Sequence, residues 1–465
     1  MWQDGGFNMN RRQFAQLLPV PLMAAGPLTE PLRAGAAQLI GAALTDGHAW
    51  ARLEHLCDRI GARLAGSKAL EQAVEWSAAE MRRDGLARVE TPRVMVPHWE
   101  RGAESAEQIE PVAAPLRMLG LGGSVATPPG GITAEVVAVE SFEEFDALPE
   151  ERVRGRMVLF NAPWRGYGPT VAYRSNGASR AARRGAVASL IRSVTPASLA
   201  TPHTGAMNYA ADAPKIPAAA LAAEDAGRIT RLAKAGVRVV VRLRMEARSL
   251  PDAASANVIA ELPGREKPEE IVVLGGHLDS WDVGTGAHDD GTGCIACWQA
   301  AVLMKNLGLI PRRTVRVVLW TNEENGLRGA QAYREWVGDG VRNHVAAIEM
   351  DGGAERPLGF GLSALAAGQA VQDRAVAQAR QVGALLAGLG AHQVNAGGGG
   401  ADIGPLMREG VPGLGLRTTG ERYFHWHHTH ADTIDHVDPE HFRLCMAAVA
   451  VMAWGLAEME PRLGA

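Results

Sequence analysis

Short runs of apolar residues, each ended by glycine or by acidic side chains, recur through the second half of the chain. The run at residues 271–274 is continuous rather than alternating, which is typical of a strand in a parallel sheet with both faces covered. A run with helical character, residues 294–307, separates two of them. This alternation predicts an α/β fold with a doubly wound mixed sheet and helices on both faces. The strand candidates are residues 256–262, 271–274, 314–320 and 345–350.

The first part of the chain shows two different patterns. Residues 48–85 place apolar side chains at helical spacing, and residues 61–67 form a glycine-containing loop between two helical stretches. Residues 88–97 alternate between apolar and polar positions, which predicts an edge strand closed by Pro97. Helices followed by one border strand are therefore expected here.

Residues 110–248 contain many short β-like runs, proline and glycine turns, and no usable cluster of metal-binding side chains. The strand candidates are residues 155–160, 185–191 and 237–241. This change of pattern predicts an inserted β-rich domain. The chain is thus expected to comprise a tail at residues 1–30, a main domain in two parts at residues 31–109 and 251–465, and an insertion at residues 110–250.

Composition narrows the classes of function. A chain of 465 residues with 47% hydrophobic content is long enough for two or three domains with their own cores. The net charge of -4 argues against nucleic acid and acidic membrane surfaces as partners and favours a small molecule or peptide. The four cysteines are too few for a disulfide framework, and Cys294 and Cys297 are interpreted as packing residues of a helix.

The N-terminus resembles a twin-arginine export signal. Arg11 and Arg12 precede an apolar stretch at residues 17–25, which contains two prolines and is much shorter than the ~20 residues that span a bilayer. We therefore expect no membrane span and an exported protein, periplasmic or secreted. The alternative is a disordered tail, which would leave the protein in the cytoplasm.

Side chains with catalytic potential gather where the predicted strands end. His277 and Asp279 follow residues 271–274, and residues two apart in an extended segment project to the same side. Glu323 and Glu324 follow the next strand, and Asp351 follows the one after it. Open α/β sheets bind ligands at the carboxyl ends of their strands, and mixed imidazole and carboxylate donors suit zinc. Further candidates are Asp289, before a glycine-rich helix start, and the histidine-rich loop at residues 427–430.

Four segments resemble the co-catalytic di-zinc exopeptidases, the family of the bacterial leucyl aminopeptidases and glutamate carboxypeptidase. The resemblance is greatest to the carboxypeptidase Q branch and extends from about His48 to the end of the chain. It implies a fold of the zinc-exopeptidase type, two zinc ions, an inserted protease-associated domain and a homodimer. The segments are GGHLDSWDVGTGAHDDG (275–291), LWTNEENG (319–326), FHWHHTHADT (424–433) and PHWERG (97–102).

The resemblance also implies a ligand set in which Asp289 bridges the two zinc ions. One ion would be held by His277, Asp289 and Asp351, and the other by Asp289, Glu324 and His428. Among the neighbouring histidines, His428 alone satisfies the family pattern His-x-x-x-Asp-Thr. The other histidines of the loop are interpreted as polar loop residues.

Three further roles follow from the resemblance. Glu323 corresponds to the general base, and Asp279 is expected to orient His277 through the second imidazole nitrogen. Asp402, which ends a glycine-rich segment, is a candidate for substrate binding, although a flexible loop is an equal alternative. His430 is a candidate for substrate binding or for supporting a metal ligand.

The leading hypothesis is a zinc exopeptidase that hydrolyses dipeptides or short peptides with free termini. An aminopeptidase is the alternative among enzymes, since the same metal pair serves both activities. A metal-free binding or receptor-like relative belongs to a different class. That hypothesis is disfavoured because every expected ligand is present.

Overall fold

The computed structural model describes residues 28–465 and contains two eight-stranded sheets. The strand β13 (Lys267–His277) lies inside the sheet with the longer strands, which we call the large sheet. It pairs in parallel with β14 and β15, and β12 and β16 introduce antiparallel pairs, so the sheet is mixed as predicted. In order across the sheet, the strands are β1 (Ala87–Glu90), β12 (Val258–Leu262), β14 (Arg313–Trp320), β13, β15 (His344–Glu349), β18 (Gly413–Thr418), β16 (Pro357–Ser363) and β17 (Gln393–Ala396).

Alternate residues of β13 face two separate cores. Val272 and Leu274 pack with the long apolar helices on one face, whereas Ile271 and Val273 pack with residues of α8 and α10 on the other. Both faces are therefore covered, which explains why this strand is continuously apolar. The helices of the first face are α1 (Glu30–Thr45), α7 (Thr292–Asn306), α9 (Gln369–Ala384) and α12 (Pro439–Glu458), and those of the second are α8 (Arg328–Val337) and α10 (Gly404–Arg408).

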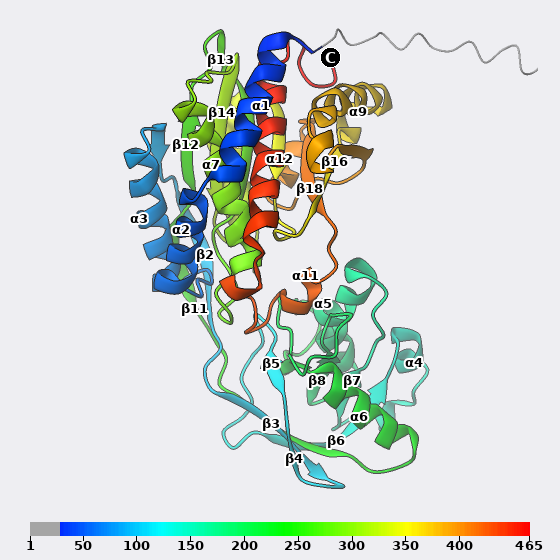
Figure 1. Cartoon of the computed structure of the whole chain (residues 1–465). Coiled ribbons are helices and arrows are strands. Elements are labelled where there is room, and N and C mark those ends of the chain that lie inside the picture. The colour runs from blue at the N-terminus through cyan, green and yellow to red at the C-terminus, as the bar shows by residue number, and fades with distance from the viewer. Residues whose placement is uncertain (1–27) are drawn as a thin grey trace, which may run out of the picture.

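Helix α12 is the one helix among residues 28–465 whose length and apolar composition would suffice to cross a membrane. However, 78% of the relevant window is buried inside the protein. It packs against α1 and α7 (Figure 1), so its apolar character is explained by its place in the core. The expected export signal at Arg11 and Arg12 lies outside the described residues.

The helices and strands before residue 101 agree with the sequence pattern except at one point. Helix α2 (His48–Glu54), a π-helical turn (His55–Ile60) and α3 (Lys68–Arg83) match the helical spacing. The expected single strand at residues 88–97 is instead two strands, β1 and β2 (Arg93–Glu100). The extended segment is interrupted at Pro92, between the two strands. Strand β1 pairs with β12 at the edge of the large sheet, whereas β2 pairs with β11 (Arg248–Ala256) and contains Pro97.

A second eight-stranded sheet is formed by residues 104–245, which we call the second region (Figure 1). It is not purely β-rich, because α4 (Phe142–Asp146) and α5 (Tyr167–Arg183) cover one face and α6 (Ala223–Lys234) covers the other. In sheet order its strands are β4 (Ala114–Leu116), β3 (Glu104–Glu110), β10 (Val240–Met245), β6 (Ile132–Val139), β7 (Met157–Phe160), β8 (Ala188–Arg192), β9 (Ala218–Leu221) and β5 (Met118–Gly120).

Helix α5 was not expected from the sequence because its residues include poor helix formers. Gly168, Pro169 and Gly177 all lie within it. Gly177 permits a close approach to the sheet, since a Cβ there would stand 3.1 Å from the ring of Phe160. Packing against the second sheet therefore outweighs the low intrinsic helix propensity.

Candidate metal centre

The predicted site residues meet at the carboxyl ends of three parallel strands. His277 is the last residue of β13, Glu323 and Glu324 follow β14, and Asp351 follows β15. Asp289 comes from the turn that opens α7, where the peptide bond between residues 289 and 290 is cis. Adjacent parallel strands deliver their following loops to one edge, so these side chains converge although they lie far apart in the sequence.

The two carboxylate oxygens of Asp289 face two different imidazoles. Oδ1 lies 3.2 Å from Nε2 of His277, and Oδ2 lies 3.2 Å from Nε2 of His428. Two ligand atoms on one tetrahedral zinc ion stand about 3.3 Å apart when each bond is about 2.0 Å. Each imidazole–carboxylate pair therefore has the separation of two ligands on one ion.

A further carboxylate completes each half of the cluster. Oε2 of Glu324 lies 3.1 Å from Nε2 of His428, and Oδ1 of Asp351 lies 3.7 Å from Nε2 of His277. Each imidazole that faces Asp289 thus has a second carboxylate beside it, and the donor atoms of His277, Asp289 and Glu324, of Asp289, His427 and His428, and of His277, Asp290 and Asp351 lie within 4.8 Å of one another in each group. This is the arrangement that a pair of metal ions with one bridging carboxylate requires.

Buried polar atoms without partners support metal binding. Among residues 28–465, Oδ2 of Asp289 and Oε1 of Glu324 are buried and accept no hydrogen bond. Burial lowers the pKa of His428, but the carboxylates of Glu324 and Asp289 more than offset this and raise it to about 10. Without a metal ion, protonated imidazoles balance the negative charge of these carboxylates. Two bound dications would balance it in their place. The donor set therefore fits zinc.

Asp279 contacts the centre through both its main-chain oxygen and its carboxylate. Nδ1 of His277 lies 2.9 Å from the main-chain oxygen of Asp279, so this nitrogen donates to a carbonyl. The carboxylate instead accepts the main-chain N–H groups of Glu323, at 2.9 Å, and Glu324, at 3.3 Å. Asp279 thereby fixes both the imidazole of His277 and the turn that carries the two glutamates.

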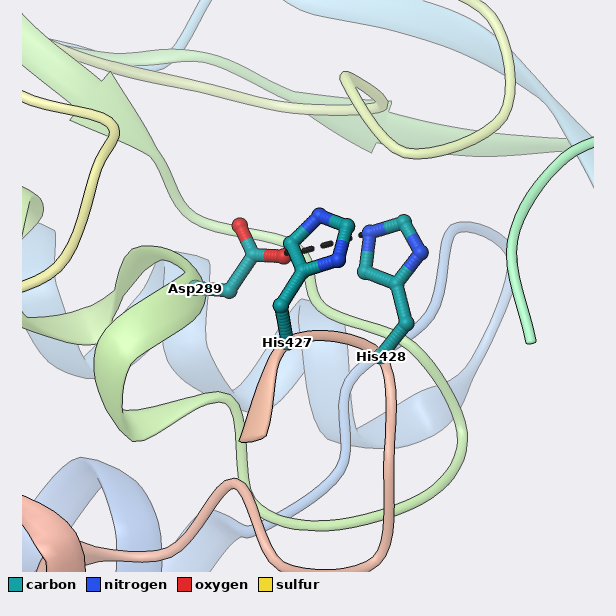
Figure 2. Close-up of side chains that lie close together, drawn as sticks. All are labelled: Asp289, His427 and His428. Carbon is teal, nitrogen blue, oxygen red and sulfur yellow. Dashed lines mark ion pairs between the residues drawn. The ribbon is translucent and has the colours of Figure 1, made fainter. Parts of the chain in front are cut away.

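The histidine loop contributes two buried rings. His427 and His428 are stacked with their ring centroids 3.5 Å apart, and both face Asp289 (Figure 2). Nε2 of His427 lies 3.5 Å from Oδ2 of Asp289, but only His428 also contacts Glu324. His430 is exposed, whereas His427 and His428 are buried.

Asp402 is buried beside a second acid that the sequence analysis did not single out. Both carboxylate oxygens of Asp402 lack a partner among residues 28–465, whereas Glu349 accepts the N–H groups of Ala401 and Ile403 at 2.9 Å. Burial raises the pKa of both acids. The charge of Asp351 raises the pKa of Glu349 further, and the charge of Glu349 raises that of Asp402 further. The sequence pattern does not mark Glu349 as a site residue, because Glu349 is the last residue of the mainly apolar strand β15.

A cavity of about 500 Å³ opens beside the two glutamates. Its walls come from β2, β11 and the second region. Glu323 is partly exposed there, whereas Glu324 is buried. The cavity is lined by, among others, His98, Trp99, Met207, Ser249, Glu323 and Asn325.

The chain matches known peptidases over most of its length. Residues 257–453 match the model of peptidase family M28. Carboxypeptidase Q of Mus musculus is 44% identical over 412 residues, which are 89% of this chain and 86% of that protein. These matches confirm the resemblance inferred from the four sequence segments.

Solved structures agree with this assignment. A peptidase M28 precursor from Shewanella amazonensis SB2B superimposes with a TM-score of 0.87 at 34% identity, covering 93% of this chain and 98% of that one. A zinc aminopeptidase from Bacillus subtilis superimposes with a TM-score of 0.65 at 19% identity, covering 88% and 95%. The second likeness concerns the fold alone.

The central position of Asp289 generates a prediction. Asp289→Asn should lower the zinc content below that of the unchanged protein, because an amide bridges two cations poorly and does not balance their charge. Zinc per chain would be measured by mass spectrometry after dialysis. Asp339→Asn, on a side chain that is 98% exposed, is the control and should retain the full metal content. Full zinc content in Asp289→Asn would contradict the bridge.

Proposed function

Since the chain belongs to peptidase family M28, we propose that it is a zinc-dependent exopeptidase that hydrolyses dipeptides or short peptides with free termini. The observation that carries this proposal is the pair of three-donor groups that share Asp289, next to a glutamate at a cavity. Relatives that match 89% of the chain are named carboxypeptidase Q, which favours that specificity.

We assign His277, Asp289 and Asp351 to one zinc ion and Asp289, Glu324 and His428 to the other. The separations of 3.1 to 3.7 Å between donor atoms support this assignment. Bound there, the zinc pair would polarise the peptide carbonyl and lower the pKa of the attacking water. His427 is the alternative ligand on the second ion, since it also faces Asp289.

Glu323 is the proposed general base. Its main-chain N–H is held by Asp279 at 2.9 Å, which positions the residue without occupying its carboxylate. Burial raises the pKa of Glu323, and Asp351 and Glu324 raise it further, so its carboxylate readily takes up a proton. Glu323 takes a proton from the attacking water and then delivers it to the leaving amine as the C–N bond breaks.

A carboxypeptidase recognises the free carboxyl end of its peptide substrate, whereas an aminopeptidase recognises the free amino end. His98 and Trp99, from the segment that resembles the carboxypeptidase Q branch, form part of the cavity wall beside Glu323. This favours the specificity of that branch over the alternative, an aminopeptidase. Asp402 remains a candidate for substrate binding, because it is buried with both oxygens unpaired among the described residues.

The resemblance to this family also supports a proposal about the domains of the chain, its oligomeric state and its location. We propose that residues 110–250 are a protease-associated domain inserted into a zinc peptidase domain at residues 31–109 and 251–465. The helices on both faces of the second sheet are compatible with such a domain. A homodimer and an exported location, periplasmic or secreted, complete the proposal.

Substrate specificity tests the proposed function directly. Zinc-loaded protein should hydrolyse dipeptides and short peptides with both ends free. Acetylated and amidated versions of the same peptides, analysed by chromatography, would show which free end is required. Loss of turnover on amidation indicates a carboxypeptidase or dipeptidase, and loss on acetylation alone indicates an aminopeptidase. No hydrolysis of any free-ended peptide would exclude the proposal.

The two neighbouring glutamates should respond differently to the same change. Glu323→Gln keeps the size of the side chain but cannot accept a proton, so we expect turnover to fall by ~10²- to 10⁴-fold with zinc content unchanged. Glu324→Gln removes a ligand, so zinc content should fall and added zinc should partly restore activity. Both variants would be measured by mass spectrometry and by dipeptide hydrolysis across a zinc titration. The opposite pattern would reverse the two assignments.

Export makes a separate prediction about the N-terminus. Replacing Arg11 and Arg12 with lysine should leave uncleaved precursor in the cytoplasm, because twin-arginine signals are read as addresses. Cell fractionation and N-terminal sequencing of the unchanged protein and the variant would decide this. If the mature protein still begins at Met1, the export signal is excluded and the alternative, a cytoplasmic protein, is favoured.

A further inference from the structure

Two consecutive residues of the second region pair with two consecutive residues of the histidine loop. Nδ1 of His203 lies 2.7 Å from the main-chain oxygen of His427. The main-chain N–H of Thr204 donates to the oxygen of His428 at 3.0 Å, and Nδ1 of His428 lies 3.2 Å from the oxygen of Thr204. Three hydrogen bonds therefore tie residues 203–204 to residues 427–428. In Figure 1 the adjoining helices α5 and α11 (Tyr423–Trp426) lie near each other where the second region meets the large sheet.

These bonds set the orientation of the His428 ring. When Nδ1 carries the hydrogen and donates it to Thr204, Nε2 keeps its lone pair and faces Asp289 and Glu324. The backbone of His428 has φ of 63°, a left-handed conformation that is uncommon for residues other than glycine. The contact with Thr204 holds this main chain in place through the oxygen of the same residue.

Arg174 of α5 in turn holds the loop that carries Thr204. Its guanidinium donates to the oxygens of Ala206, at 3.2 Å, and Thr204, at 3.4 Å, and to the hydroxyl of Tyr167, at 2.9 Å. The side chain is buried and also lies 3.4 Å from Nδ1 of His428. Gly205 leaves room for it, since a Cβ there would be 2.3 Å from the guanidinium.

Independent contacts join the same two segments. The hydroxyl of Thr195 donates to the oxygen of Phe424 at 2.6 Å. The ring of Tyr167 stacks on that of Phe424 with centroids 5.1 Å apart. The histidine loop is thus fixed to the second region at Phe424 as well as at His427 and His428.

We propose that the second region completes the metal centre by positioning His428, with Arg174 and Thr204 as positioning residues. The second region is therefore part of the catalytic apparatus, although it supplies no ligand. This inference rests on the proposed assignment of His428 to the second zinc ion. It predicts that damage to Arg174 weakens one zinc site and leaves the other intact.

The test compares Arg174→Met with Arg183→Met. Both arginines are on α5, but Arg183 is exposed and pairs with Asp212 at the surface. The affinities of the two sites would be measured by competition with a zinc chelator, and folding by thermal unfolding of the metal-free protein. In Arg174→Met we expect one zinc ion to bind ~10- to 100-fold more weakly, the usual effect of losing a group that supports a ligand. The other site, and both sites of Arg183→Met, should match the unchanged protein.

Conservative variants keep the test decisive if Arg174→Met does not fold. Tyr167→Phe removes one partner of Arg174 and preserves the aromatic stacking, so we expect the same site to weaken by about two- to fivefold. Arg174→Lys keeps the charge but not the planar donors, and it should fall between Arg174→Met and the unchanged protein.

The outcomes separate this inference from the proposed function. If the unchanged protein binds two zinc ions and hydrolyses peptides while Arg174→Met and Tyr167→Phe retain both affinities, the positioning role is excluded and the proposed function stands. If both sites weaken equally, the role specific to His428 is also excluded. A protein that binds no zinc before any change would instead overturn the proposed function.

Discussion

The carboxylate of Asp289, buried between two imidazoles, is the interaction on which the rest of the centre depends. Its two oxygens stand 3.2 Å from His277 and His428, and Glu324, Asp351 and other acids surround it. So many acids in a region of low dielectric repel one another strongly unless cations are present. The fold gathers these acids at the ends of three strands, and two metal ions are the natural counter-charge. We therefore expect a change at this carboxylate to affect both halves of the centre.

Much of the fold and most of the centre could be predicted because their signals are local. Mainly apolar runs predicted β12, β13, β14 and β15, and residues 271–274 of β13 are apolar without interruption because this part of the sheet is covered on both faces. The carboxyl ends of such strands are known ligand positions, which directed attention to His277, Glu324 and Asp351. The resemblance to the family pattern His-x-x-x-Asp-Thr then favoured His428 in a loop with several histidines, and among these histidines His428 contacts both Asp289 and Glu324 in the structure.

The remaining features depend on contacts that leave no trace in the sequence. Helix α5 contains glycine and proline, and packing rather than propensity makes it helical. Asp279 holds main-chain N–H groups, and Thr204 holds His428 through its own main-chain atoms, so neither partner is marked by residue type. The sequence of residues 110–248 therefore does not reveal that His203 and Thr204 lie against the histidine loop.

Arg101 lies in the segment PHWERG (97–102), to which no metal ligand is assigned, and it contacts two other parts of the chain near the centre. Its guanidinium binds both oxygens of Asp282, at 2.8 and 2.6 Å, and reaches the hydroxyl of Thr204 at 3.3 Å. Asp282 belongs to the loop after β13, whereas Thr204 belongs to the second region. Arg101, which directly follows β2, thus links the loop between His277 and Asp289 to Thr204. The cavity beside Glu323 has walls from β2 and from residues 206–208, so the segments that Arg101 and Thr204 connect also border this cavity.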